Sequence, residues 1–330
     1  MAARRDWTRE KLVEAVRAGD RRALARAITL VENGDPLAYE VVHDLYPGTG
    51  HAAAVGITGP PGVGKSSLLS GLIRIARAEG KTVGVISVDP SSPFTQGALL
   101  GDRIRLTEHF LDPDVFIRSM GTRGHQGGLA ETTLQSLLIL DAAGKDIVFL
   151  ETVGTGQSEI GVLSIADTVV LALMPGSGDS IQALKAGIME IPDVIAINKM
   201  DHPMAKTMLN EVRQMLALGM HEGWNPPIVL TEAMRGEGLA TLWERISEHH
   251  RWLEAEDELE ERRRRNLARE VFQVASARAR RHIEEAVKGD EELQRLLHDV
   301  QERKLDPLTA VREILEKVFH IGDEDHTHPH

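Results

Sequence analysis

The chain has 330 residues with 38 basic and 50 acidic side chains, a net charge of −12 and no cysteine. Without cysteine it can form no disulfide, no thiolate metal site, no iron–sulfur cluster and no thiol nucleophile. The acidic balance argues against binding to nucleic acid or to an anionic membrane surface, and 4% aromatic residues leave few platforms for stacking bases. No stretch approaches the ~20 apolar residues of a membrane span, and the charged N-terminal stretch lacks the apolar core of a signal peptide. These features predict a cytoplasmic protein that needs neither nucleic acid nor a membrane as a partner.

Residues 1–50 are predicted to form a helical extension. Apolar residues recur at near-helical spacing over residues 5–33, which predicts two short amphipathic helices. The segment Pro47-Gly48-Thr49-Gly50 then interrupts the chain, because proline and glycine favour turns. We therefore expect the next domain to begin at about residue 51.

Residues 51–250 alternate between strand and helix patterns. The strand-like runs are apolar throughout, as is typical of strands buried on both faces of a parallel sheet. They are Ala53–Thr58, Thr82–Val88, Asp146–Glu151, Thr168–Leu173, Asp193–Asn198 and Pro227–Thr231. Helical stretches lie between most of them, at Ser66–Glu79, Glu131–Ala143 and Met204–Leu218. The alternation predicts a three-layer α/β domain around a mostly parallel sheet.

Residues 251–320 contain almost no glycine and are dense in Glu, Arg, Leu and Ala, which predicts a helical region. Within it we expect helices over Glu291–Arg303 and from Pro307 onward. Their apolar faces would pack on the core or pair with another subunit. The basic run Arg262–Arg265 follows an acidic run, and we interpret it as i,i+4 ion pairing along a helix rather than as a phosphate site. Residues 321–330 are expected to be a disordered tail.

The strongest local motif matches G-x-x-x-x-G-K-[ST], between a predicted strand and a predicted helix. Its residues are Gly59, Pro60, Pro61, Gly62, Val63, Gly64, Lys65, Ser66 and Ser67. The glycines let backbone N–H groups converge on a phosphate, and the helix N-terminus adds its positive dipole end. Lys65 would neutralise the β- and γ-phosphates, and the Ser66 hydroxyl would ligate Mg²⁺. The motif predicts a P-loop nucleotide site.

The segment Asn198-Lys199-Met200-Asp201 predicts that the base is guanine. It follows an apolar strand, at the edge where α/β sheets bind ligands. A carboxylate at Asp201 accepts hydrogen bonds from both guanine N1–H and the 2-amino group, a pair of donors that adenine lacks. The Lys199 stem would lie on the purine, and Asn198 would brace the P-loop.

Glu151 lies directly after an apolar run, at the position where a P-loop protein carries its Walker B acidic residue. It is a candidate Mg²⁺ ligand, and the Gly154 N–H is a candidate contact to the γ-phosphate. Gln157 is a candidate for orienting the attacking water, although it stands two residues beyond the position used by small Ras-like GTPases. Asp89 and Asp102 are further carboxylates expected near the metal.

Together these segments give the chain a resemblance to a known family. GPPGVGKSSLL, SVDPSSPFTQGALLGDRIRL, FIRSMGTRGHQGGL, ETVGTGQSE, GDSIQALKAG and NKMD occur in this order. The chain resembles the MeaB/ArgK family of P-loop GTPases, which includes the methylmalonic aciduria type A protein. The resemblance implies a GTPase that acts as a chaperone of an adenosylcobalamin-dependent acyl-CoA mutase. It would gate cofactor loading and protect or reactivate the mutase.

The resemblance also implies roles for individual residues. The family's Mg²⁺ site maps onto Ser66, Asp89, Asp102 and Glu151, and its base-binding loop maps onto Thr231-Glu232-Ala233. A third switch segment that signals to the mutase would contain Asp179, Gln182 and Lys185. The C-terminal helical arm would form a homodimer.

Two other functions remain open from the sequence. A nickel-insertion GTPase of the same superclass is disfavoured because such proteins usually rely on cysteine. A P-loop kinase of a small molecule or protein would need an acceptor site that no motif supplies. The D-x-H-x-x-G pattern of cobalamin-binding chains is absent, so we expect that this chain does not itself bind cobalamin. The cobalamin-binding subunit of the mutase is a candidate for the partner that the resemblance implies.

Overall fold

The structure is a computed structural model that describes residues 7–89, 106–121, 128–152, 164–176, 192–218 and 223–319. It divides into two compact units, Met1–Glu270 and Val271–His330. The helix α11 (Glu258–Gly289) begins in the first unit and ends in the second. We describe each unit by itself.

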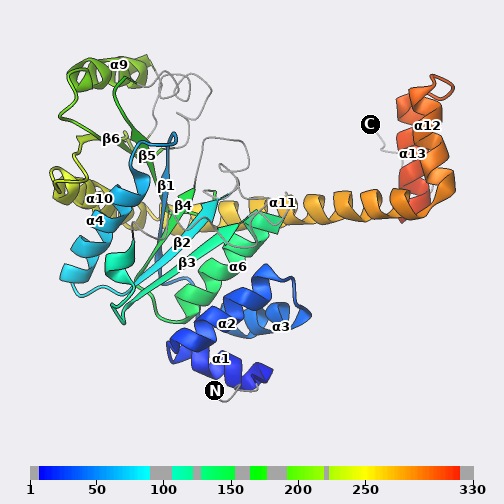
Figure 1. The fold of residues 1–330 in the computed structure, drawn as a ribbon, viewed down its shortest axis with the longest axis horizontal. Helices are drawn as coiled ribbons and strands as arrows, with labels where there is room; N and C mark the ends of the chain where they lie inside the picture. Colours follow the sequence, from blue (N-terminus) through cyan, green and yellow to red (C-terminus); the bar gives the residue numbers. More distant parts are fainter. Residues whose placement is uncertain are drawn as a thin grey trace. The chain divides into compact units, whose positions relative to one another are not determined.

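The first unit is built on a seven-stranded sheet with the order β3-β2-β4-β1-β5-β6-β7, and every described pair of neighbouring strands is parallel (Figure 1). The strands are β1 (Ala53–Thr58), β2 (Val83–Asp89), β3 (Val115–Gly121), β4 (Ile147–Thr152), β5 (Thr168–Leu173), β6 (Val194–Ile197) and β7 (Ile228–Leu230). The predicted α/β fold with a parallel sheet is confirmed.

The edge strand β3 was missing from the sequence prediction. Its sequence VFIRSMG carries Arg118 in the middle, which breaks the apolar run that marked the other strands. The Arg118 guanidinium forms an ion pair with Glu32 and donates to Thr29 Oγ1 at 3.1 Å. This charge is tolerated because it is paired at the sheet's edge, where a neighbouring helix can reach it.

One face of the sheet is covered by α4 (Lys65–Ala78) and α10 (Leu239–Ala255). The other face is covered by α6 (Gly128–Ala142) and α9 (Ala205–Leu218). Successive strand residues point to opposite faces, so Val169 and Leu171 pack toward α6 and α9 while Val170 and Ala172 pack toward α4 and α10. The predicted three layers follow from this arrangement.

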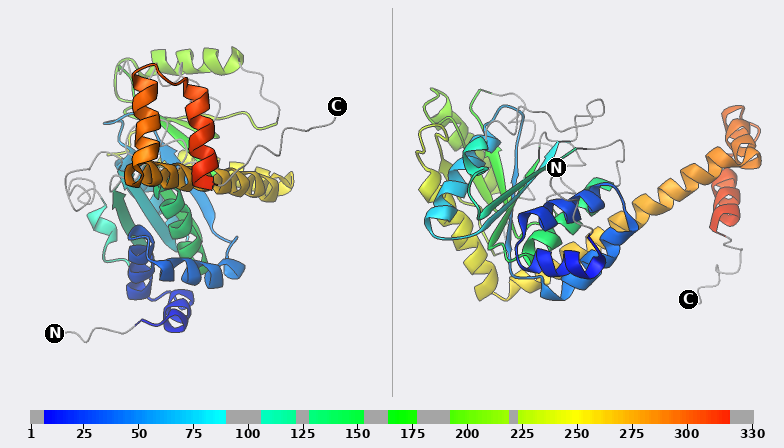
Figure 2. Two further views of the ribbon diagram at one scale, coloured as in Figure 1. Left: turned by 90° about the vertical axis from the view of Figure 1, so that its right-hand side faces the viewer. Right: turned by 60° about the horizontal axis from the view of Figure 1, so that its bottom comes forward.

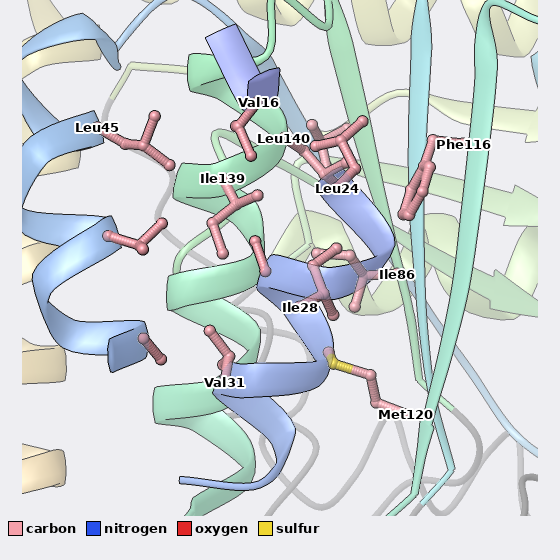
Figure 3. Packing of buried hydrophobic residues seen from close by; sticks show 14 of the residues in the cluster. Val16, Leu24, Ile28, Val31, Leu45, Ile86, Phe116, Met120, Ile139 and Leu140 are labelled. Atoms are coloured by element: carbon pink, nitrogen blue, oxygen red, sulfur yellow. The ribbon is translucent and has the colours of Figure 1, made fainter. Parts of the chain in front are cut away.

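Three N-terminal helices add a further layer outside α6. They are α1 (Arg9–Arg17), α2 (Arg21–Glu32) and α3 (Pro36–Leu45), and Figure 2 shows them gathered beside α6. Figure 3 shows Val16, Leu24 and Ile28 packed toward Ile139 and Leu140 of α6. Only two of these helices were predicted from the sequence. The third begins at Pro36, after Asp35 caps the backbone N–H of Leu37 at 3.0 Å.

The second unit contains the remainder of α11 with α12 (Glu291–Gln301) and α13 (Pro307–Phe319). Lys317 Nζ pairs with Asp290 Oδ2 at 2.8 Å and with Glu292 Oε2 at 2.5 Å, which ties α13 to the start of α12. Phe272 and Leu308 remain 73% and 81% exposed. Among the helices of the described residues, none combines the length and the apolar character that crossing a lipid bilayer requires.

Candidate nucleotide-binding site

The P-loop connects β1 to α4 and depends on glycine at two crowded positions. Gly59 has φ 144°, and a Cβ there would lie 2.1 Å from the Ala172 carbonyl oxygen. Gly64 has φ 96°, and a Cβ there would lie 2.5 Å from Asn198 Nδ2. Larger residues would therefore push β5 and Asn198 away from the loop. The loop is held close to the carboxyl ends of the central strands.

Lys65 begins α4, and its side chain is folded back along the loop. Its Nζ donates to the carbonyl oxygens of Gly59, at 2.5 Å, and Pro60, at 3.2 Å. The side chain is buried, so its ammonium lies under the loop at the N-terminal end of the helix. A phosphate held by the loop's N–H groups would meet this charge together with the helix dipole.

Glu151, near the end of β4, accepts hydrogen bonds from two serines. Ser66 Oγ donates to Glu151 Oε1 at 2.6 Å, and Ser87 Oγ donates to Oε2 at 3.0 Å. Glu151 is only 2% exposed. A hydroxyl and a carboxylate at the head of a P-loop helix are the oxygen ligands that Mg²⁺ prefers. The described Ser66 and Glu151 side chains therefore fit a Mg²⁺ site.

Asn198 joins the P-loop to the loop after β7. Its Nδ2 donates to the Val63 carbonyl oxygen at 2.8 Å. Its Oδ1 accepts from the Ala233 N–H at 3.1 Å and from Thr231 Oγ1 at 3.2 Å. One buried amide thus fixes two segments that are far apart in sequence, and it holds the P-loop beside residues 231–233.

Lys199 and Asp201 extend the same loop into solvent. Lys199 has φ 57°, and its Nζ donates to the Gly62 carbonyl oxygen at 3.0 Å, so its stem lies across the entrance of the P-loop. Asp201 is exposed, and the preceding Met200 N–H donates to the Thr231 carbonyl oxygen at 3.0 Å, which holds this loop against residues 231–233. An exposed carboxylate next to a lysine stem is suited to receive the polar edge of a purine while the stem covers its face.

Comparison with known proteins shows to which family the chain belongs. The family described as Methylmalonyl Co-A mutase-associated GTPase MeaB matches residues 24–288. The chain is a member of the MeaB family. The resemblance seen in the sequence is confirmed, and the chain is a GTPase whose ligands are GTP and GDP.

Relatives of this MeaB-family GTPase align over nearly its whole length. A putative GTPase of Pyrococcus abyssi (strain GE5 / Orsay) is 47% identical over 317 residues, covering 95% of this chain and 98% of the relative. GTPase ArgK of Escherichia coli (strain K12) is 32% identical over 92% of this chain and 95% of its own. The crystal structure of an LAO/AO transport system kinase has a TM-score of 0.73 at 26% identity, covering 96% of this chain and 100% of that one.

Several predicted site residues lie outside the described part of the chain. These are Asp102, Gly154, Gln157, Asp179, Gln182 and Lys185. For Asp89 the structure gives the backbone, at the end of β2 beside Gly121 of β3, but not the side chain. The P-loop, Glu151, the segment 198–201 and residues 231–233 are therefore the part of the predicted site that the structure brings together.

A cluster that was not predicted from the sequence anchors the P-loop helix. Ser70 Oγ of α4 donates to Glu108 and lies 3.0 Å from His109 Nε2. The hydrogen bond from Ser70 lowers the pKa of Glu108, and burial lowers the pKa of His109. Glu108 and His109 belong to the short helix η2 (Thr107–His109), which follows residues 90–105 in sequence. The cluster ties η2 to α4. It could not be predicted, because a single serine in a helix gives no sequence signal.

At the opposite, amino edge of the sheet lies a cavity of about 430 Å³. Leu134, Leu137 and Leu267 supply apolar walls. Its charged lining is already paired, because Arg263 Nε donates to Asp167 Oδ1 at 2.8 Å and Asp141 Oδ2 accepts from the Gly50 N–H at 2.6 Å. Among the described residues, those predicted to bind phosphate lie at the carboxyl edge and not around this cavity.

Proposed function

We propose that this protein is a Mg²⁺-dependent GTPase that serves as a chaperone of an adenosylcobalamin-dependent acyl-CoA mutase. Its GTPase cycle would gate loading of the cofactor and protect or reactivate the mutase. The observation that carries the nucleotide part is the single Asn198 amide that joins the P-loop to the base loop. The mutase part is supported by the family, which is described as mutase-associated.

In this proposal the P-loop residues 59–67 hold the phosphates, and Asn198, Lys199, Asp201 and residues 231–233 hold guanine. Ser66 and Glu151, with Asp89 and Asp102, hold Mg²⁺, which when bound would neutralise charge on the phosphates. Lys65 stabilises the charge that develops on the transferred phosphoryl group. Water is the acceptor.

Gly154 and Gln157 follow Glu151 along the chain. The Gly154 N–H is proposed to contact the γ-phosphate, and Gln157 is proposed to place the attacking water. Asp179, Gln182 and Lys185 would carry the nucleotide state to the partner. These residues belong to the segments that adjoin β4 and β5 in sequence. Nucleotide state would thus be communicated from the carboxyl edge of the sheet.

We also propose that residues 1–50 form a helical extension of the GTPase domain at 51–250, that residues 251–320 form an arm for homodimerisation, and that residues 321–330 are a tail without fixed structure. The exposed Phe272 and Leu308 support an arm that meets a second copy. Cobalamin would be bound by the mutase, on its cobalamin-binding subunit where it has one. The protein would act in the cytoplasm.

The test is GTP hydrolysis by the purified chain alone and with each candidate partner. The candidates are methylmalonyl-, isobutyryl-, ethylmalonyl- and 2-hydroxyisobutyryl-CoA mutases. We expect slow hydrolysis by the chain alone, stimulation by one mutase, and labelled γ-phosphate appearing only in inorganic phosphate. Failure of every mutase to stimulate hydrolysis would contradict the chaperone proposal, and label on a protein or small molecule would indicate a kinase.

A further inference from the structure

Ser87 contacts Glu151 from a part of the molecule separate from the P-loop. It lies on β2, directly opposite Glu151 in the parallel β2–β4 ladder. The Ser87 hydroxyl donates to Glu151 Oε2 at 3.0 Å, and both residues are buried, at 6% and 2% exposure. The contact therefore joins two neighbouring strands near their carboxyl ends.

The two serines that contact Glu151 differ in what else they must do. Ser66 Oγ donates to Glu151 Oε1, yet the same hydroxyl is the one that a P-loop turns to a nucleotide-bound cation. Ser87 lies on a strand hydrogen-bonded on both sides, to β3 and to β4. Its bond to Oε2 does not compete with the P-loop serine, so it can persist whether or not a nucleotide is bound.

We propose that Ser87 is a positioning residue that holds the Glu151 carboxylate in the orientation required for Mg²⁺. The hydroxyl fixes Oε2, which leaves Oε1 directed at Ser66 and the head of α4. Groups that orient a metal-binding carboxylate from behind typically change metal affinity by roughly 10–100-fold when removed. This inference rests on the Mg²⁺-dependent GTPase activity proposed above, and it adds a residue outside the predicted Mg²⁺ site.

The test compares Ser87→Ala with Ser87→Thr, which keeps the hydroxyl, in the full chain. The matched control is Ser136→Ala, because Ser136 is also buried but its hydroxyl lies 3.6 Å from Met120 Sδ, away from Glu151. GDP affinity is measured with a fluorescent GDP analogue in Mg²⁺ and in EDTA, and hydrolysis is measured across a Mg²⁺ titration. Thermal unfolding checks that each variant is folded.

For Ser87→Ala we expect the Mg²⁺ concentration for half-maximal hydrolysis to rise about tenfold, and the gain in GDP affinity on adding Mg²⁺ to shrink by a similar factor. GDP affinity in EDTA should stay unchanged, because the lost group orients the metal ligand and not the nucleotide. Ser87→Thr should restore the Mg²⁺ dependence, and Ser136→Ala should match the wild type. If Ser87→Ala does not fold, Ser87→Cys, which nearly keeps the volume with a weaker donor, should show a smaller shift in the same direction.

A Mg²⁺ titration of Ser87→Ala that coincides with those of the wild type and Ser136→Ala would overturn this inference. So would an affinity loss that persists in EDTA, because that result would indicate general damage to the nucleotide site. If the wild type itself bound GDP and hydrolysed GTP without regard to Mg²⁺, the proposed function would fail together with the inference. The Mg²⁺ dependence of the wild type thus separates failure of the proposed function from failure of the Ser87 inference alone.

Discussion

The two edges of the sheet both carry buried charged groups, but those groups are used differently. At the amino edge, Arg263 binds the Asp167 carboxylate with Nε and one terminal nitrogen, each at 2.8 Å, and Arg262 binds both oxygens of Asp193 at 2.9 and 2.7 Å. These pairs tie the start of α11 to the residues just before β5 and β6. At the carboxyl edge, Lys65 contacts backbone carbonyls of a glycine loop, and Glu151 contacts two hydroxyls.

This difference separates a structural charge cluster from a ligand site. A pair of formal charges that bind each other through two hydrogen bonds has little left to offer a ligand. The described contacts of Lys65 are carbonyl oxygens and those of Glu151 are hydroxyls, and neutral groups of this kind accompany a charged side chain without neutralising it. The cavity of about 430 Å³ lies at the amino edge, whereas the proposed phosphate and Mg²⁺ sites lie at the carboxyl edge.

The largest expected effect on stability is at the amino edge. Arg263→Ala would leave Asp167, which is 2% exposed, without its cation, and breaking such a buried pair costs about 3–5 kcal/mol of unfolding free energy. Urea unfolding of the variant measures this, with Arg264→Ala as the control because the Arg264 side chain is 74% exposed. GTP affinity should not change. A loss no greater than that of the control would show that the amino edge does not depend on this pair.

Lys65→Ala should act on turnover instead of stability. Removing a group that stabilises transition-state charge lowers kcat by roughly 100–1,000-fold. The measurement is GTP hydrolysis at saturating GTP and Mg²⁺, with the exposed Lys206→Ala as the control. Hydrolysis within about threefold of the wild type would place the catalytic charge elsewhere.

A smaller, pH-dependent effect is expected at Glu270 of α11. Glu270 is fully buried, and neither carboxylate oxygen has a hydrogen-bond partner among the described residues; burial, with repulsion from Glu131, raises its pKa to about 7. The folded state therefore binds its proton more tightly than the unfolded state, so stability falls as pH rises from about 4.5 to 7. Glu270→Gln should match the wild type near pH 4.5 and be more stable above pH 7 by on the order of 3 kcal/mol.

Urea unfolding at a series of pH values checks this expectation, with the exposed Glu285→Gln as the control. His249 supplies an opposite trend that both proteins share: burial lowers its pKa to about 4, so stability falls as pH decreases from 6.5 toward 4. Subtracting the unfolding free energy of the wild type from that of the Glu270→Gln variant at each pH removes the contribution of His249. Parallel stability curves for the two proteins would contradict the buried, protonated state of Glu270.

Most of the sheet could be predicted because its strands are buried on both faces and therefore read as apolar runs. The strand β3 could not, since Arg118 in its centre is explained only by Glu32, many residues away in sequence. The third N-terminal helix, α3, lay beyond the periodic segment that marked the first two. In both cases a tertiary contact or a cap decided the structure where local periodicity was weak.

The candidate site was predictable where backbone geometry is encoded by glycine and by a fixed spacing, as in the P-loop. Ser87 was not, because a single serine in a strand has no meaning until the β2–β4 register places it opposite Glu151. The interpretation of Arg262–Arg265 as helical i,i+4 pairs was wrong for Arg262 and Arg263, which bind carboxylates at the sheet edge. Arg265 does pair with Glu261 one turn away, at 3.7 Å.

The central claim, that the carboxyl edge forms a guanine-specific nucleotide site, is tested most directly by calorimetric titration of GTP, ATP and xanthosine triphosphate. The proteins compared are the wild type, Asp201→Asn and the exposed control Asp257→Asn. We predict that the wild type and the control prefer GTP, whereas Asp201→Asn loses about a hundredfold in GTP affinity. The variant should gain affinity for xanthosine triphosphate, because the Asn amide can donate to the xanthine 2-oxo group where the carboxylate accepts from the guanine 2-amino group. Unchanged GTP affinity in Asp201→Asn would contradict the account.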